Sequence, residues 1–248
     1  MRDFAALHRA GDPLVLPNVW DVASARSLAD AGFPALGTTS LGVAAASGLP
    51  DGLGATAAET LRLIRALATL PVCLTADIET GSVEAAAAVA ASGAVGVNME
   101  DAMGPAAAHA ALISAVKQQV PGLFVNARTD THWQRPGDLR ETLHRVRRYA
   151  DAGADGVFVP GLSEPADIAA VVAAVDLPVN ILFLPGRHTV AELADLGVRR
   201  ISTGSLLFRA ALAAAVRTAE AVRDGLPIAT GLPSYTQVNA AASAPAPG

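Results

Sequence analysis

The chain contains a single cysteine, Cys73, and a single lysine, Lys117, among its 248 residues. One cysteine excludes an internal disulfide and any metal centre built from several cysteines. Cys73 stands at the start of a run of strand-forming residues, which predicts a buried structural side chain. Lys117 lies in the polar helical stretch ISAVKQQV. We expect it to be exposed there, which argues against a Schiff-base lysine.

The sequence also lacks a basic excess and a long uninterrupted apolar run. Its net charge is -5 and 17% of its residues are charged, so it offers no basic face for nucleic acid. No stretch reaches the roughly 18 uncharged apolar residues that a membrane span needs, and the start MRDFAALHRAGDP has no apolar signal-peptide core. We therefore expect a cytoplasmic protein that binds neither nucleic acid nor membrane.

Short β-rich runs alternate with Ala- and Leu-rich helical stretches along most of the chain. The first pair is LVLPNV followed by ASARSLADAG, and the last is RRISTGS followed by LLFRAALAAAVRTAEAV. Eight such pairs predict an α/β protein with a single (β/α)8 TIM barrel, and the length suits one such domain. Glycines that suit left-handed helix ends follow several helices, at Gly32, Gly93, Gly153, Gly197 and Gly225.

We place the barrel domain at residues 1–238. Within it, FAALHRAG is expected to form a short helix that closes the bottom of the barrel. Residues 239–248 are rich in Pro and Ala and carry no pattern to bury, so we expect a disordered tail.

Polar side chains gather where the predicted strands end, which is where barrel enzymes carry their active sites. The stretch LTADIETG sets Asp77 and Glu79 two residues apart, so both carboxylates face the same side of the strand. The set at the strand ends is Asn18, Trp20, Asp21, Thr38, Thr39, Ser40, Asp77, Glu79, Asn98, Glu100, Asp101, Asn126, Arg128, Asp130 and, just beyond, His132. Neighbouring strands therefore direct several carboxylates and one guanidinium toward a common mouth.

The carboxylates in this set predict a metal site. Asp77, Glu79 and Glu100 would repel one another without a cation, and a hard divalent ion removes that cost. Carboxylate and water ligands without His or Cys favour Mg²⁺, with Mn²⁺ as an alternative, over Zn²⁺. Mg²⁺ leaves coordination positions open for a chelating 2-oxo acid. Arg128 could then hold a substrate carboxylate or stabilise an enolate.

Several of these residues also have a structural interpretation, which is as good as the functional one for Asp101 and Asp130 and better than it for Asp51 and Asp21. Asp101 and Asp130 also suit helix capping or bonding to loop amides. Asp51 lies in a Pro-Asp-Gly sequence typical of a turn, and Asp21 precedes ASARSLADAG as an N-cap would. His132 is a candidate only because it follows the fifth strand.

Six segments follow one another in a characteristic order: LPNVWDVASARSLADAGFPALGTTS, PDG, TADIETG, GAVGVNMEDA, VNARTDTHW and YADAGADGVFVPG. With them the chain resembles the isocitrate lyase and phosphoenolpyruvate mutase superfamily from about residue 10 to residue 238. The resemblance implies a (β/α)8 barrel that binds Mg²⁺ and a 2-oxo acid or its enolate, often as a tetramer with an exchanged last helix. Members cleave or form C–C or P–C bonds beside a 2-oxo acid carboxylate.

The resemblance also implies roles for individual residues. It assigns catalytic roles to Asp51, Glu100 and Arg128, and metal ligation to Asp77, Glu79 and Glu100. The substrate-binding candidates are Thr39 and Ser40 in the turn that holds the substrate carboxylate, Asn180 on the seventh strand, and Trp20 from the strand-end set. Water or His132 would donate the proton.

The sequence departs from the family's lyases after the fourth strand. Those enzymes carry a long mobile loop with Lys-Xaa-Cys-Gly-His, whose cysteine serves as acid and base. Here AMGP at residues 102–105 leads directly into a predicted helix. Cys73 cannot replace that cysteine, because it lies at the opposite end of its strand from Glu79.

These observations predict a Mg²⁺-dependent carbon–carbon lyase or decarboxylase that acts on a 2-oxo acid, or releases one, through a metal-stabilised enolate. Decarboxylation of an oxaloacetate-like acid makes the least demand on a missing lid. The alternatives are phosphonopyruvate mutase or hydrolase chemistry and a catalytically silent 2-oxo acid binding protein. The expected partners are a small 2-oxo acid or dicarboxylate and further copies of the chain, as a tetramer or dimer.

Overall fold

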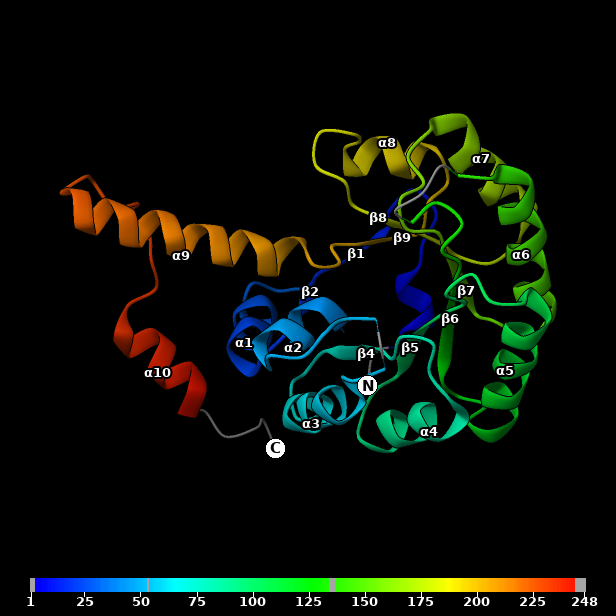
Figure 1. Ribbon diagram of the computed structural model, residues 1–248, viewed down its shortest axis with the longest axis horizontal. Helices are drawn as coiled ribbons and strands as arrows, with labels where there is room; N and C mark the ends of the chain where they lie inside the picture. The colour runs from blue at the N-terminus through cyan, green and yellow to red at the C-terminus, as the bar shows by residue number, and fades with distance from the viewer. Residues whose placement is uncertain (1–2, 53, 134–136, 244–248) are drawn as a thin grey trace.

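A parallel sheet lies at the centre of the computed structural model, which describes residues 3–52, 54–133 and 137–243 (Figure 1). Within these residues the sheet has nine strands in the order β1-β9-β8-β7-β6-β5-β4-β3-β2. The strands are β1 Leu14–Leu16, β2 Asn18–Val19, β3 Ala35–Thr38, β4 Cys73–Asp77, β5 Gly96–Glu100, β6 Phe124–Arg128, β7 Gly156–Phe158, β8 Val179–Leu182 and β9 Arg200–Ser202.

The two ends of this order are almost joined. β1 pairs with β9 and β2 pairs with β3, and only Pro17 separates β1 from β2. Proline has no N–H to donate to the ladder, so it interrupts what is otherwise one strand. The sheet is therefore a nearly closed barrel in which β1 and β2 together take the place of the first strand. The predicted TIM-barrel-like fold is confirmed.

Helices follow one another around the outside of the sheet (Figure 1). They are α1 Val22–Asp30, α2 Ser40–Ala46, α3 Ala57–Leu67, α4 Val83–Ala91, α5 Ala106–Gln119, α6 Leu139–Asp151, α7 Pro165–Ala174 and α8 Val190–Asp195. The 3-10 helix η1 Ala5–Leu7 precedes β1, and α9 Leu206–Asp224 and α10 Tyr235–Ser243 end the described chain. The five glycines expected at helix ends all have positive φ, as predicted. α2 was not predicted, because its seven residues are too few to show a helical period. No helix among the described residues is long and apolar enough to cross a membrane.

The last two helices leave the barrel. Figure 1 shows α9 extending away from the sheet and α10 folding back, where it contacts α1. Residues 239–243, which we expected to belong to a disordered tail, form the end of α10. Residues 244–248 lie outside the described part of the chain.

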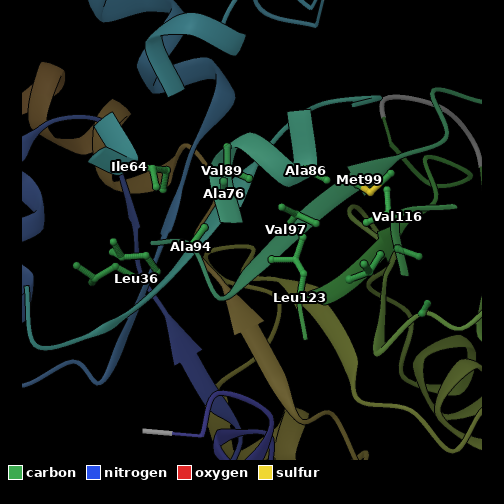
Figure 2. Close-up of a cluster of buried hydrophobic side chains, with 14 of the residues drawn as sticks. Leu36, Ile64, Ala76, Ala86, Val89, Ala94, Val97, Met99, Val116 and Leu123 are labelled. Carbon is green, nitrogen blue, oxygen red and sulfur yellow. The ribbon is translucent and has the colours of Figure 1, made fainter. Parts of the chain in front are cut away.

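Apolar side chains of the strands and the facing helices form the core between sheet and helices. Figure 2 shows Val97 and Met99 of β5 in this layer, with Ile64 from α3 and Val89 from α4 in the same cluster. Cys73 is buried, as expected. The prediction for Lys117 was wrong: its ammonium lies 2.7 Å from Asp155 and is partly buried, because α5 turns this side chain toward the start of β7.

The bottom of the barrel is filled by the segment around η1. The Phe4 ring meets the Phe124 ring edge-on with centroids 5.2 Å apart, and the His8 ring stacks on Phe124 at 4.7 Å. The guanidinium of Arg200 lies 5.9 Å above the Phe4 ring. The bottom is therefore closed by packed side chains, as predicted, and the opposite end is left for chemistry.

Candidate functional site

A cavity of about 310 Å³ opens at the carboxyl ends of the strands. Its walls come from the ends of most strands and from the segments that follow them. The polar and charged lining includes Asn18, Thr39, Ser40, Asp51, Asp77, Glu79, Asn98, Glu100, Arg128, Asp130, Ser202, Thr203 and Arg209. The prediction that several carboxylates and a guanidinium share one mouth is confirmed.

Arg128 lies at the centre of the charged wall. Its Nη1 is 2.8 Å from a carboxylate oxygen of Glu100, and its Nε is 2.7 Å from Asp130. Burial would lower the pKa of Arg128, but the facing carboxylates outweigh it and the pKa is raised. The rings of Trp133 and Phe158 lie 5.7 and 5.9 Å from its guanidinium carbon. Arg128 is therefore a permanently charged group held between acids and aromatic rings.

The carboxyl groups of Glu100 and Asp77 are perturbed by burial. Burial, reinforced by nearby carboxylates and opposed by Arg128, raises the pKa of Glu100 to about 7. Burial also raises the pKa of Asp77, again against the influence of Arg128. Both groups would ionise more readily if a further cation lay beside them.

The carboxylates of Asp77 and Glu100 suit Mg²⁺ better than a metal that needs three or more protein ligands. The described residues contain no group of three or more His, Cys, Asp or Glu side chains arranged to hold a metal. Mg²⁺ is commonly bound through one or two carboxylates, with water and ligand oxygens completing its octahedron. Asp77 and Glu100 on neighbouring strands β4 and β5 fit that requirement.

Glu79, which the sequence predicts as a metal ligand, accepts two hydrogen bonds in the structure. Its two carboxylate oxygens accept hydrogen bonds from the Gly54 amide at 2.6 Å and the Thr56 hydroxyl at 2.5 Å. The side chain is therefore occupied by the segment ahead of α3. Spacing along β4 correctly placed Glu79 at the mouth, but it could not show which neighbour its oxygens contact.

Trp20, Asn180 and His132, by contrast, do not contribute to the cavity wall. Trp20 packs edge-on against Phe208 of α9, with ring centroids 5.3 Å apart. Asn180 is fully buried in β8, two residues below Leu182 at the rim. His132 turns back under α6, where its Nε2 lies 3.0 Å from the Thr142 hydroxyl. Burial lowers the pKa of His132 there. Thr39, Ser40 and Asp51 do line the cavity.

The sequence did not reveal the hydrogen bonds of Asp101, which lie behind Arg128. The Asp101 carboxylate accepts hydrogen bonds from Arg145 at 2.8 Å and from the Tyr149 hydroxyl at 2.7 Å. Its other oxygen accepts from the backbone amide of Asp130 at 3.2 Å. Burial would raise the pKa of Asp101, but these and other donors outweigh it and the pKa is lowered. For Asp101 the sequence left two structural roles open, helix capping and bonding to loop amides, and the structure shows bonding to a loop amide.

Other missed residues come from the cavity wall itself. Trp133, Phe158 and Arg209 all line it. The position of Phe158 at the end of its strand could have placed it near the cavity. An apolar residue in a strand is usually part of the core, however, so the sequence does not single it out. Arg209 lies in the first turn of α9, and nothing in the local pattern distinguishes it from a surface arginine.

Comparison with known proteins adds a family and two relatives. The family model described as "Phosphoenolpyruvate phosphomutase" matches residues 4–223. An uncharacterised protein of Mycobacterium tuberculosis is 44% identical over 96% of this chain and 95% of its own length. An oxaloacetate decarboxylase of Bradyrhizobium diazoefficiens is 30% identical over 85% of this chain and 80% of its own.

A solved structure supports the fold. Phosphonopyruvate hydrolase in complex with oxalate and Mg²⁺ superposes with a TM-score of 0.82 at 23% identity. The match covers 96% of this chain and 93% of the other. At this identity the likeness concerns the barrel and the way its strands are connected.

Proposed function

The chain belongs to the phosphoenolpyruvate mutase and isocitrate lyase superfamily, and from this membership we propose that it is a Mg²⁺-dependent lyase that decarboxylates an oxaloacetate-like 2-oxo acid. Superfamily relatives of known activity include lyases and decarboxylases, and at least one member of the fold binds Mg²⁺ with oxalate. The observation that carries the proposal is the arrangement of Arg128 beside Glu100 and Asp77 in the cavity.

Different side chains would bind the metal and the substrate. Asp77 and Glu100 would hold Mg²⁺, which when bound supplies a Lewis acid for the 2-oxo group. Arg128 already satisfies two carboxylates, so a substrate carboxylate would replace Glu100 or Asp130 as its partner. That exchange keeps the guanidinium paired and aligns the substrate with it. The buried Phe158 ring limits water beside this group, which strengthens its attraction for an anion.

Charge development on the substrate explains how the site would accelerate decarboxylation. As the C–C bond to the departing carboxylate breaks, its electron pair forms an enolate and carbon dioxide leaves. Arg128 is placed to stabilise the growing negative charge, a role that typically contributes about 3–4 kcal/mol. The enolate carbon then takes a proton from water, which completes the reaction.

The short connection after β5 favours decarboxylation over the other C–C cleavages. Only residues 101–105 lie between the end of β5 and α5. A retro-aldol cleavage needs a protein base for the hydroxyl proton, whereas loss of carbon dioxide removes no proton. His132, the side chain considered for proton transfer, lies outside the cavity wall.

Phosphonopyruvate chemistry is the second candidate function. It is favoured by the description of the matched family model, which names a phosphomutase. A P–C bond enzyme would use the same 2-oxo acid half of the cavity. Phosphorus NMR separates this reaction from decarboxylation.

Apolar side chains exposed on α9 support a homo-oligomer. Leu212, Val216 and Val222 are 53%, 58% and 63% exposed along a helix that stands away from the barrel. We propose that further copies of the chain cover them, as a dimer or tetramer. Light scattering coupled to gel filtration measures the mass that tests this proposal.

The reaction is tested by incubating purified protein with oxaloacetate, phosphonopyruvate, methylisocitrate and 2,3-dimethylmalate, with and without Mg²⁺. Proton and phosphorus NMR follow each substrate, and the Glu100→Gln variant controls for contaminants. Metal-dependent loss of oxaloacetate to pyruvate, beyond the uncatalysed rate, is the expected result. Binding of oxo acids without turnover would instead support a silent binding protein.

A further inference from the structure

Glu79 lies on the boundary between the cavity and the chain that leads into α3. Its side chain is only 4% exposed. One carboxylate oxygen accepts from the Gly54 amide at 2.6 Å, and the other accepts from the Thr56 hydroxyl at 2.5 Å. Both donors lie more than 20 residues earlier in the chain. The carboxylate thus links the end of β4 to the start of α3.

The backbone of Glu79 is held in an uncommon conformation. Its φ of 54° lies in the left-handed region, which is unfavourable for residues other than glycine. The Glu79 amide donates to the Asp77 carboxylate at 3.1 Å, and its carbonyl accepts from the Glu100 amide at 2.9 Å. These bonds fix the position of Glu79 relative to the two proposed metal ligands, and the turn directs its side chain toward α3.

Thr56 supplies independent support. It occupies the N-cap position of α3, where a threonine hydroxyl usually accepts a bond from a helix amide. Here the hydroxyl makes no such capping bond and donates to Glu79 instead. Thr56 is only 2% exposed. If Glu79 turned away to ligate a metal, this buried hydroxyl would lose its acceptor, which is unfavourable for a polar group out of contact with water.

We propose that Glu79 is a positioning residue, which anchors Gly54 and Thr56 against the cavity and thereby sets Asp51 in its wall, and that it is not a metal ligand. Asp51 and Gly52 line the cavity just ahead of the anchored residues. The inference rests on the proposed function only for the role of Asp51. The anchor itself is a property of the folded chain without substrate.

Three variants of the full chain test the anchor. Thr56→Val removes the hydroxyl donor and leaves every carboxylate in place. Glu79→Gln replaces one acceptor oxygen by an NH₂ group, which faces a donor. Thr60→Val is the matched control, because Thr60 is a buried threonine one turn further along α3 whose hydroxyl has no partner among the described residues.

Two measurements are made on each variant. Hydrogen exchange of the Gly54 amide reports the anchor, and calorimetric titration reports Mg²⁺ affinity. We expect exchange to become about tenfold faster in both Thr56→Val and Glu79→Gln, as the loss of one such bond implies, with the Thr60→Val control unchanged. The Mg²⁺ dissociation constant should change by a similar factor in Thr56→Val and Glu79→Gln and stay unchanged in Thr60→Val, because the first two variants loosen the same anchor and none of the three removes a ligand.

Two results would overturn the proposal. One is Gly54 exchange in Thr56→Val and Glu79→Gln that matches the parent. The other is a loss of Mg²⁺ affinity of about tenfold or more in Glu79→Gln alone, which would make Glu79 a ligand. Exchange is measured without metal or substrate, so it decides the anchor even if the parent binds no Mg²⁺ and the proposed reaction fails. Circular dichroism of each variant confirms that it is folded.

Discussion

Arg128 donates from Nη1 to a carboxylate oxygen of Glu100 across 2.8 Å, and the two residues are register partners on the adjacent strands β6 and β5. Strand pairing alone therefore brings the guanidinium and the carboxylate together at the mouth of the barrel. An anionic substrate that approaches Arg128 must compete with Glu100, and a cation beside Glu100 would free Arg128 for that substrate.

Arg128→Lys should lower kcat/KM for the proposed substrate by about 100-fold. Lysine keeps the charge but has no planar fork, so it cannot face a substrate carboxylate and a neighbouring acid at the same time. Steady-state assays of oxaloacetate loss measure the effect. A change of threefold or less would mean that Arg128 does not contact the substrate.

The stability of the metal-free protein should fall as the pH rises from about 4.5 to about 7. The folded-state pKa of Glu100 is raised to about 7 from its ordinary value of 4.5, so the folded state holds its proton more tightly than the unfolded chain. The stabilisation is complete below about pH 4.5 and is lost as the pH rises through the folded pKa, by roughly 1–3 kcal/mol.

Urea denaturation in EDTA at pH 5 and pH 7 measures this pH dependence. Glu100→Gln should reduce it, because the amide does not titrate. Added Mg²⁺ should restore stability at pH 7, since it binds the ionised form of the folded protein. A slope that is the same in the parent and in Glu100→Gln would assign the effect to other groups.

Tyr149→Phe should destabilise the protein by about 1–3 kcal/mol, because it removes a hydrogen bond of 2.7 Å to the buried Asp101 carboxylate. Tyr235→Phe is the matched control, since Tyr235 is 85% exposed. The midpoints of urea denaturation compare the two variants. Equal stability of both would show that the Tyr149 hydroxyl contributes nothing to the support of Asp101.

His132→Gln should leave turnover within about threefold of the parent. The ring is bonded to Thr142 beneath α6 and does not line the cavity, whereas a general acid typically contributes at least 100-fold. The same oxaloacetate assay measures it. A loss of that size in a variant that remains folded would return His132 to the proton-transfer step.

Much of this site could be predicted from the sequence, because side chains alternate between the two faces of a strand and the site lies where the strands end. Asp77, Glu100 and Arg128 follow strand-forming runs, and parallel strands bring their carboxyl ends to one edge. The depth of a side chain in the barrel and the direction in which it points do not follow from the local sequence alone. Asn180 falls two residues too deep in β8, and the positive φ of Glu79 redirects its side chain toward Thr56. Such outcomes depend on contacts between segments far apart in the chain.

The proposed function is tested most directly by the rate of oxaloacetate decarboxylation by the purified protein at increasing Mg²⁺, with uncatalysed decay subtracted. We predict saturable, Mg²⁺-dependent release of pyruvate that falls by about 100-fold in Arg128→Lys and in Glu100→Gln. Pyruvate release that equals the uncatalysed decay at every Mg²⁺ concentration, or that is the same in the parent and in both variants, would contradict the proposed function.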